Sequence, residues 1–82
     1  MNDQKTAIVT GGAKGLGKAI SETLAATGAL VVVADMEIGK ARETADSITG
    51  QGGAAVAMEV NIAEEASVLA LYQAVKALSP SV

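Results

Sequence analysis

The stretch Thr10–Gly17, with the sequence TGGAKGLG, decides how this 82-residue chain is expected to fold. It follows the β-branched run Thr6–Thr10, which is typical of a buried strand. After it, residues 16–27 carry apolar side chains at the spacing of a helix with one buried face. The sequence therefore predicts a strand, a glycine-rich turn and a helix in immediate succession.

The glycines of this turn are expected to have separate purposes. One lets the chain turn sharply off the strand, a second lets the backbone approach a pyrophosphate, and a third lets the helix pack close to the sheet. We assign these purposes to Gly11, Gly15 and Gly17, with Gly12 as a supporting fourth. The following helix N-terminus offers unpaired N–H groups and a positive dipole end to phosphates. A merely flexible loop is the alternative, but the flanking strand and helix favour phosphate binding.

The rest of the chain repeats the alternation of strand and helix. Strands are expected at residues 30–34 and 54–60, and helices at residues 37–49 and 63–78. The βαβαβα order predicts a Rossmann-type α/β fold, in which a parallel sheet is connected by right-handed crossovers. One face of the last helix is expected to carry Val68, Leu71, Tyr72, Val75 and Leu78.

An acidic residue follows the second expected strand. Asp35 lies about 20 residues beyond the glycine-rich turn, where a carboxylate can accept hydrogen bonds from the adenosine ribose hydroxyls. The same charge repels a 2′-phosphate, so it favours NAD over NADP. An N-cap for the helix that begins near Glu37 is the alternative. The combination with the glycines favours the ribose role.

The turn matches a Thr-Gly-x-x-x-Gly-x-Gly fingerprint at all of its fixed positions, which are Thr10, Gly11, Gly15 and Gly17. Because this is the fingerprint of the classical short-chain dehydrogenase/reductase family, the chain resembles that family. The similarity runs from about residue 5 to residue 82. It implies an NAD-dependent oxidoreductase that transfers hydride between the cofactor and an alcohol or ketone. The cofactor-binding residues that the resemblance and the motif together indicate are Thr10, Gly11, Gly12, Lys14, Gly15, Leu16, Gly17, Asp35, Asn61 and Ile62.

Two positions need comment against the family pattern. Members usually carry Asp-Val after the third strand, where this chain has Asn61 and Ile62. An amide oxygen can still accept a hydrogen bond from the adenine amino group, and Ile62 can offer its backbone to adenine. Lys14 occupies a position that is often basic in relatives that use NADP, although an exposed loop lysine is the alternative. Because Asp35 opposes NADP, we expect NAD as the cofactor.

The pair Tyr72 and Lys76 fits the Tyr-x-x-x-Lys catalytic pattern of the family. In relatives that pair follows the fifth strand, whereas here it falls in the helix after the third. We therefore interpret Tyr72 as a core-facing aromatic residue and Lys76 as its solvated neighbour, and we assign no catalytic residue.

Composition argues against several classes of partner. The net charge is −3 and the six basic residues are scattered, which disfavours nucleic acid. Cysteine and histidine are absent, which removes disulfides and most zinc sites, so no metal site is expected. The sequence has no run of about 18 apolar residues that could span a membrane and no signal-peptide pattern at its start. We expect a cytoplasmic protein.

Residues 1–82 are expected to form one partial dinucleotide-binding domain that stops before a fourth strand, which would begin near Ser81 and Val82. In the family strand order 3-2-1-4-5-6, the first strand would then be an exposed edge. The alternatives to an enzyme are a catalytically inactive nucleotide-binding fragment and a chain that self-associates through this edge. The resemblance implies that full-length relatives are homo-oligomeric. The residues identify no substrate.

Overall fold

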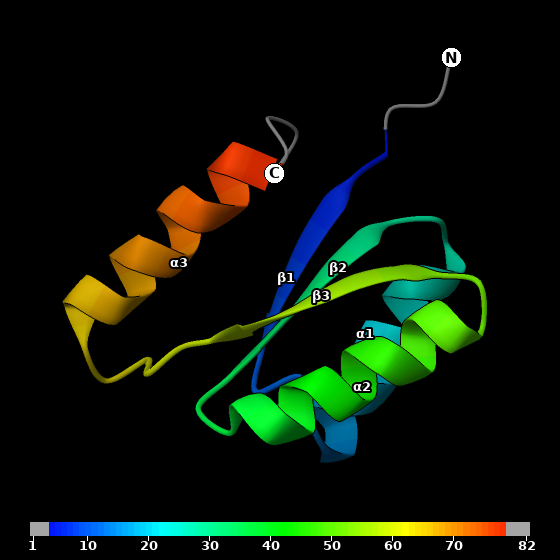
Figure 1. Ribbon diagram of the computed structural model, residues 1–82, viewed down its shortest axis with the longest axis horizontal. Coiled ribbons are helices and arrows are strands. Elements are labelled where there is room, and N and C mark those ends of the chain that lie inside the picture. The colour runs from blue at the N-terminus through cyan, green and yellow to red at the C-terminus, as the bar shows by residue number, and fades with distance from the viewer. Residues whose placement is uncertain (1–3, 79–82) are drawn as a thin grey trace.

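The computed structural model describes residues 4–78. Its elements follow the predicted βαβαβα order (Figure 1). They are β1 (Thr6–Thr10), α1 (Gly15–Ala26), β2 (Leu30–Asp35), α2 (Ile38–Gly50), β3 (Ala54–Glu59) and α3 (Glu65–Leu78). The predicted fold class is confirmed, and each element begins and ends within two residues of the expected position. The expected start of a fourth strand at Ser81 and Val82 lies outside the described residues.

The three strands form one parallel sheet in the order β1-β2-β3. Leu30 of β2 lies opposite Thr6 of β1 and Ala54 of β3, so the three strands start level. The central strand β2 is buried from Val31 to Asp35. Within the described residues β1 pairs with β2 alone, which agrees with the expected 3-2-1 order.

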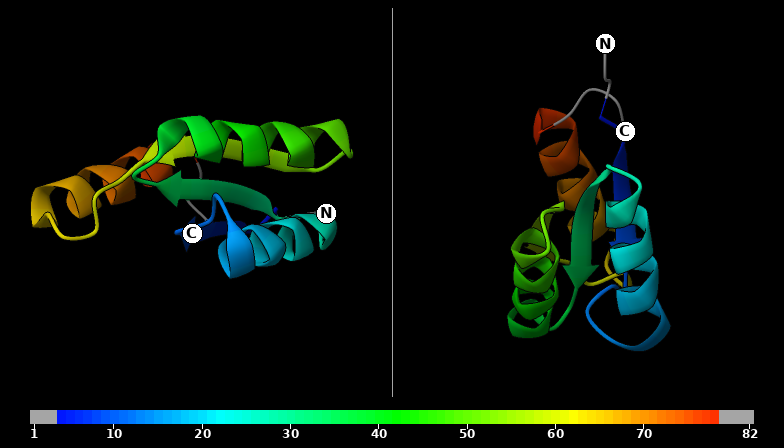
Figure 2. Two further views of the ribbon diagram at one scale, coloured as in Figure 1. Left: turned by 90° about the horizontal axis from the view of Figure 1, so that it is seen from below. Right: turned by 90° about the vertical axis from the view of Figure 1, so that its right-hand side faces the viewer.

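Successive side chains of β2 point to opposite faces of the sheet and so supply two separate cores. Val31 and Val33 pack with α1 and α2, whose buried residues include Ala25 and Ile48. Val32 and the other side chains of the opposite face pack with α3. Figure 1 shows α3 across the strands from α1 and α2, and Figure 2 shows α1 and α2 running alongside each other.

The third helix buries few of its side chains against the sheet. Leu71 and Val75 pack on the sheet, whereas Val68, Tyr72 and Leu78 are 41%, 49% and 50% exposed. Within residues 4–78, α3 covers only a narrow strip of the sheet and no second helix packs on that face, so only the two residues one turn apart become buried.

No helix between residues 4 and 78 has the length and apolar character needed to cross a membrane. Over the same range, no three or more His, Cys, Asp or Glu side chains cluster closely enough to hold a metal ion.

Candidate functional site

A hollow of about 530 Å³ lies at the carboxyl ends of the three strands. Each strand contributes through the segment that follows it, because parallel strands all end at the same edge of the sheet. The lining residues are Gly11, Lys14, Asp35, Met36, Glu37, Val60 and Ile62. In open α/β sheets ligands bind at this edge, so the fold brings several of the predicted site residues to the expected place.

The glycine-rich turn needs glycine for two different reasons. Gly11 and Gly15 have φ angles of +67° and +59°, in the left-handed region where a Cβ causes strain. A Cβ at Gly17 would collide with the carbonyl oxygen of Gly11, and one at Gly12 would lie 2.8 Å from the carbonyl oxygen of Val9. Gly12 is therefore a close-packing position in its own right, beyond the supporting role predicted for it.

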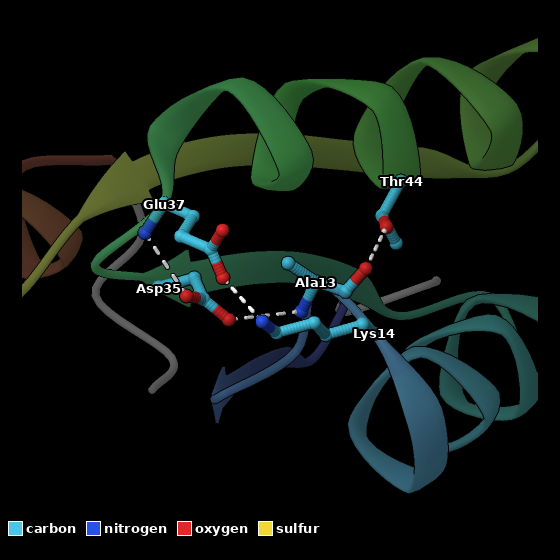
Figure 3. Close-up of polar contacts among 5 residues, drawn as sticks. All are labelled: Ala13, Lys14, Asp35, Glu37 and Thr44. Carbon is cyan, nitrogen blue, oxygen red and sulfur yellow. Dashed lines mark hydrogen bonds and ion pairs between the residues drawn. The ribbon is translucent and has the colours of Figure 1, made fainter.

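The turn is held from two sides. The amide of Gly11 donates to the carbonyl of Ala34 at 2.8 Å, which ties the turn to the end of β2. The hydroxyl of Thr44, buried on α2, donates to the carbonyl of Ala13 at 2.9 Å (Figure 3). These contacts fix the backbone that leads into α1. The first-turn amides of that helix have no partner inside it, so they are available to an anion.

Asp35 joins this turn to the start of α2. The residue is 9% exposed, and its carboxylate accepts hydrogen bonds from the amides of Ala13 at 3.3 Å and Glu37 at 3.0 Å (Figure 3). Helix α2 begins at Ile38 with Glu37 as its N-cap residue, so Asp35 is not the cap that the alternative interpretation required. An ionised carboxylate has about four lone-pair positions, and two backbone donors leave capacity for a ligand.

An ion pair crosses the same hollow. The Lys14 ammonium contacts the Glu37 carboxylate, and both side chains are largely exposed (Figure 3). The hydrogen bond and the negative charge of Glu37 raise the pKa of Lys14 above its ordinary value, and Asp35 adds to the effect. Lys14 is thus exposed, as the alternative interpretation expects, and it is paired with Glu37. Sequence spacing does not signal this pair, because the two residues meet only through the placement of the two helix starts.

The remaining predicted positions border the hollow in different ways. Ile62 lines it and is 68% exposed. Asn61 faces a neighbouring hollow, where its side-chain oxygen accepts a hydrogen bond from the amide of Ala63 at 3.0 Å. Thr10 ends β1 and Leu16 lies exposed in the first turn of α1. Contact of Asn61 with adenine stays a prediction, and one lone pair of its oxygen is already engaged.

Tyr72 and Lys76 lie on α3, away from the hollow. The Lys76 ammonium lies 5.6 Å from the centre of the Tyr72 ring, within range of a cation–π contact. The expected core-facing position of Tyr72 is wrong, because its ring is half exposed. Neither side chain lines the hollow at the strand ends.

The sequence of this chain is similar to those of known dehydrogenases. The sequence profile described as "short chain dehydrogenase" matches residues 5–82. A 7alpha-hydroxysteroid dehydrogenase of Escherichia coli strain K12 is 42% identical over 69 residues, which are 84% of this chain and 27% of that protein. The chain spans about a quarter of the length of the curated relatives it matches.

Two solved structures are also similar to this chain. A citronellol catabolism dehydrogenase of Pseudomonas aeruginosa PAO1 superposes with a TM-score of 0.91 at 36% identity, covering 95% of this chain and 33% of the other. A metagenomic short-chain oxidoreductase in complex with NADP superposes with a TM-score of 0.90 at 29% identity, covering 93% and 34%.

Proposed function

This chain belongs to the short-chain dehydrogenase family, and from that premise we propose that it holds the ADP half of NAD within an NAD-dependent oxidoreductase. The cofactor supplies the hydride chemistry at its nicotinamide end when bound. The residues of this chain bind and orient the opposite end. The hollow at the strand ends receives the adenosine, and the glycine-rich turn with the start of α1 receives the pyrophosphate.

The observation that carries this proposal is the position of Asp35. Its carboxylate lines the hollow, where backbone donors on both sides fix it in place. A carboxylate held in this way can accept hydrogen bonds from both ribose hydroxyls without reorganising. A 2′-phosphate at the same place would meet a like charge at close range. The proposal therefore favours NAD over NADP, although one similar structure contains NADP.

The phosphate contacts rest on backbone rather than on side chains. A Cβ built at Gly11 or Gly15 would meet no atom within 4 Å, so the backbone there borders open space. A pyrophosphate can approach it closely and accept hydrogen bonds from the first-turn amides of α1. We assign no substrate. The similar proteins act, by their names, on a hydroxysteroid and in citronellol catabolism, which are chemically different classes.

Substitution of Asp35 by Asn tests the proposal. The variant keeps one oxygen as an acceptor and removes the charge. Because a hydrogen bond to a charged group contributes about 1.5–3 kcal/mol, we expect NAD to bind about 10- to 100-fold more weakly. NADP binding should stay constant or improve, since the repulsion is gone. Calorimetric titration of both nucleotides gives the ratio of the two affinities.

Asp46→Asn is the matched control, because Asp46 is exposed on α2 and the substitution removes the same charge. Its ratio of NAD to NADP affinity should equal that of the parent. Equal affinity of the parent protein for the two nucleotides would contradict the proposed preference. Failure of the parent to bind NAD, NADP or ADP-ribose would remove the proposed function itself.

A further inference from the structure

We propose that Glu37 is a specificity-determining residue, which strengthens the preference for NAD by holding the Lys14 ammonium away from a 2′-phosphate. Resting on the proposed function, this inference adds a residue that neither the sequence motif nor the family resemblance indicates. Asp35 repels the phosphate directly, whereas Glu37 acts by engaging the Lys14 ammonium, which would attract it.

Lys14 and Glu37 both lie at the start of a helix. Lys14 is the N-cap residue of α1 and Glu37 is the N-cap residue of α2. The Glu37 amide donates to Asp35 at 3.0 Å, and the Glu37 carbonyl accepts from the amide of Ala41 at 3.0 Å. Because its backbone amide and carbonyl are both hydrogen-bonded, the Glu37 side chain extends from a well-defined backbone position. Its carboxylate meets Lys14 at the hollow, above the carboxylate of Asp35 (Figure 3).

Few charged side chains among the described residues line the hollow. Among the described residues that line the hollow, Lys14 is the only basic one, and Asp35 and Glu37 are the acidic ones. A 2′-phosphate on the adenosine ribose needs a cation, and Lys14 is the candidate. To bind that phosphate, Lys14 must leave Glu37, so the Glu37 carboxylate and the phosphate compete for the same ammonium group. The raised pKa of Lys14 agrees with a working interaction between the two groups.

The expected change in NADP affinity depends on how exposed the two paired side chains are. The side chains of Lys14 and Glu37 are 65% and 50% exposed, so solvent and salt weaken their attraction. Exposed ion pairs of this kind are weak. We therefore expect removal of the Glu37 charge to change NADP affinity by about fivefold and NAD affinity by less. Asp35 remains the dominant group.

The test is a double-mutant cycle on Glu37→Gln and Lys14→Gln, read by calorimetric titration with NAD and with NADP. Glu37→Gln keeps the length of the side chain and the backbone amide that Asp35 binds. In the parent background it should tighten NADP binding by about fivefold. In the Lys14→Gln background the same substitution should gain less than about twofold, because no cation remains to be released.

Controls separate this effect from a general change of charge. Glu43→Gln removes the same charge from an exposed position on α2 and should leave both affinities unchanged. The gain in NADP affinity should also shrink in high salt, as expected for an exposed charge contact. An unchanged NADP affinity in Glu37→Gln, or an equal gain with and without Lys14, would overturn the inference.

The outcomes distinguish this inference from the proposed function. If the parent binds NAD and Asp35→Asn lowers that affinity while Glu37→Gln has no effect on NADP, only the role of Glu37 fails. If the parent binds neither the dinucleotides nor ADP-ribose, the proposed function fails and the inference fails with it.

Discussion

A single methyl group at residue 17 would collide with the glycine-rich turn that precedes it. The Cβ of an alanine there would lie 3.0 Å from the Cα of Gly12 and closer still to the carbonyl group of Gly11. Helix α1 can approach the turn this closely only because Gly17 has no side chain. The contact is between backbone atoms, so no flexible side chain can move aside to relieve it.

Gly17→Ala should therefore destabilise the protein and weaken NAD binding together. Overpacking of this kind costs about 1–3 kcal/mol of unfolding free energy, and the displaced turn would carry its amides away from the phosphates. Urea unfolding and calorimetric titration measure the two losses. Gly39→Ala is the control, because a Cβ at Gly39 on α2 meets no atom within 4 Å. Equal stability of the two variants would contradict the packing argument.

Single residues also show which features of the site a local sequence pattern can predict. The motif spacing identified Gly11, Gly15 and Gly17 because their purposes are set by backbone geometry, which a local pattern encodes. The close packing at Gly12 is not evident from the spacing, since part of it comes from Ser21 of α1, whose hydroxyl oxygen would lie 3.0 Å from a Cβ at Gly12. Glu37 was missed as a site residue because its partner is 23 positions away and no periodic pattern links them.

Among the elements, α2 supports the site as well as covering the sheet. Its buried Thr44 donates a hydrogen bond to Ala13, the residue whose amide binds Asp35 (Figure 3). The helix, the turn and the end of β2 are thus joined through one short stretch of backbone. A substitution on the buried side of α2 should therefore alter nucleotide binding.

Thr44→Val tests this connection, because valine has nearly the shape of threonine but cannot donate. The carbonyl of Ala13 would stay buried without its partner, which costs about 1–3 kcal/mol of unfolding free energy. NAD affinity should fall at the same time. Thr49→Val, at an exposed position of the same helix, should change the unfolding free energy by less than about 0.5 kcal/mol. Undisturbed NAD affinity in Thr44→Val would show that the turn does not depend on α2.

The helices differ in how well their sequences predicted them. Apolar periodicity located α3 and the side chains that share its apolar face, but such a pattern does not show how much of that face finds a partner. Leu71 and Val75 are buried because β2 lies beneath them. Val68 and Leu78 have the same apolar character, yet within the described residues they have too little neighbouring surface to become buried.

At the scale of the whole molecule, the site exists because all three strands point the same way. The segments after β1, β2 and β3 meet at one edge, and the hollow there is lined from all three. The alternation of strand and helix was enough to predict this, because parallel connections bring successive carboxyl ends together. The details that a pattern could not supply, such as the hydrogen bond from the Ala63 amide to the Asn61 side chain, depend on short loops between elements.

A site assembled from every strand should stabilise the whole fold when it is filled. A ligand that binds only the folded state adds about 2.7 kcal/mol of unfolding free energy at a concentration 100 times its dissociation constant. Because the proposed contacts all go to the ADP half, ADP-ribose should stabilise this chain nearly as much as NAD at equal saturation. Nicotinamide mononucleotide at the same concentration should stabilise it very little. Urea unfolding with each ligand measures the difference, and stabilisation by the mononucleotide equal to that by ADP-ribose would place the contacts at the wrong end of the cofactor.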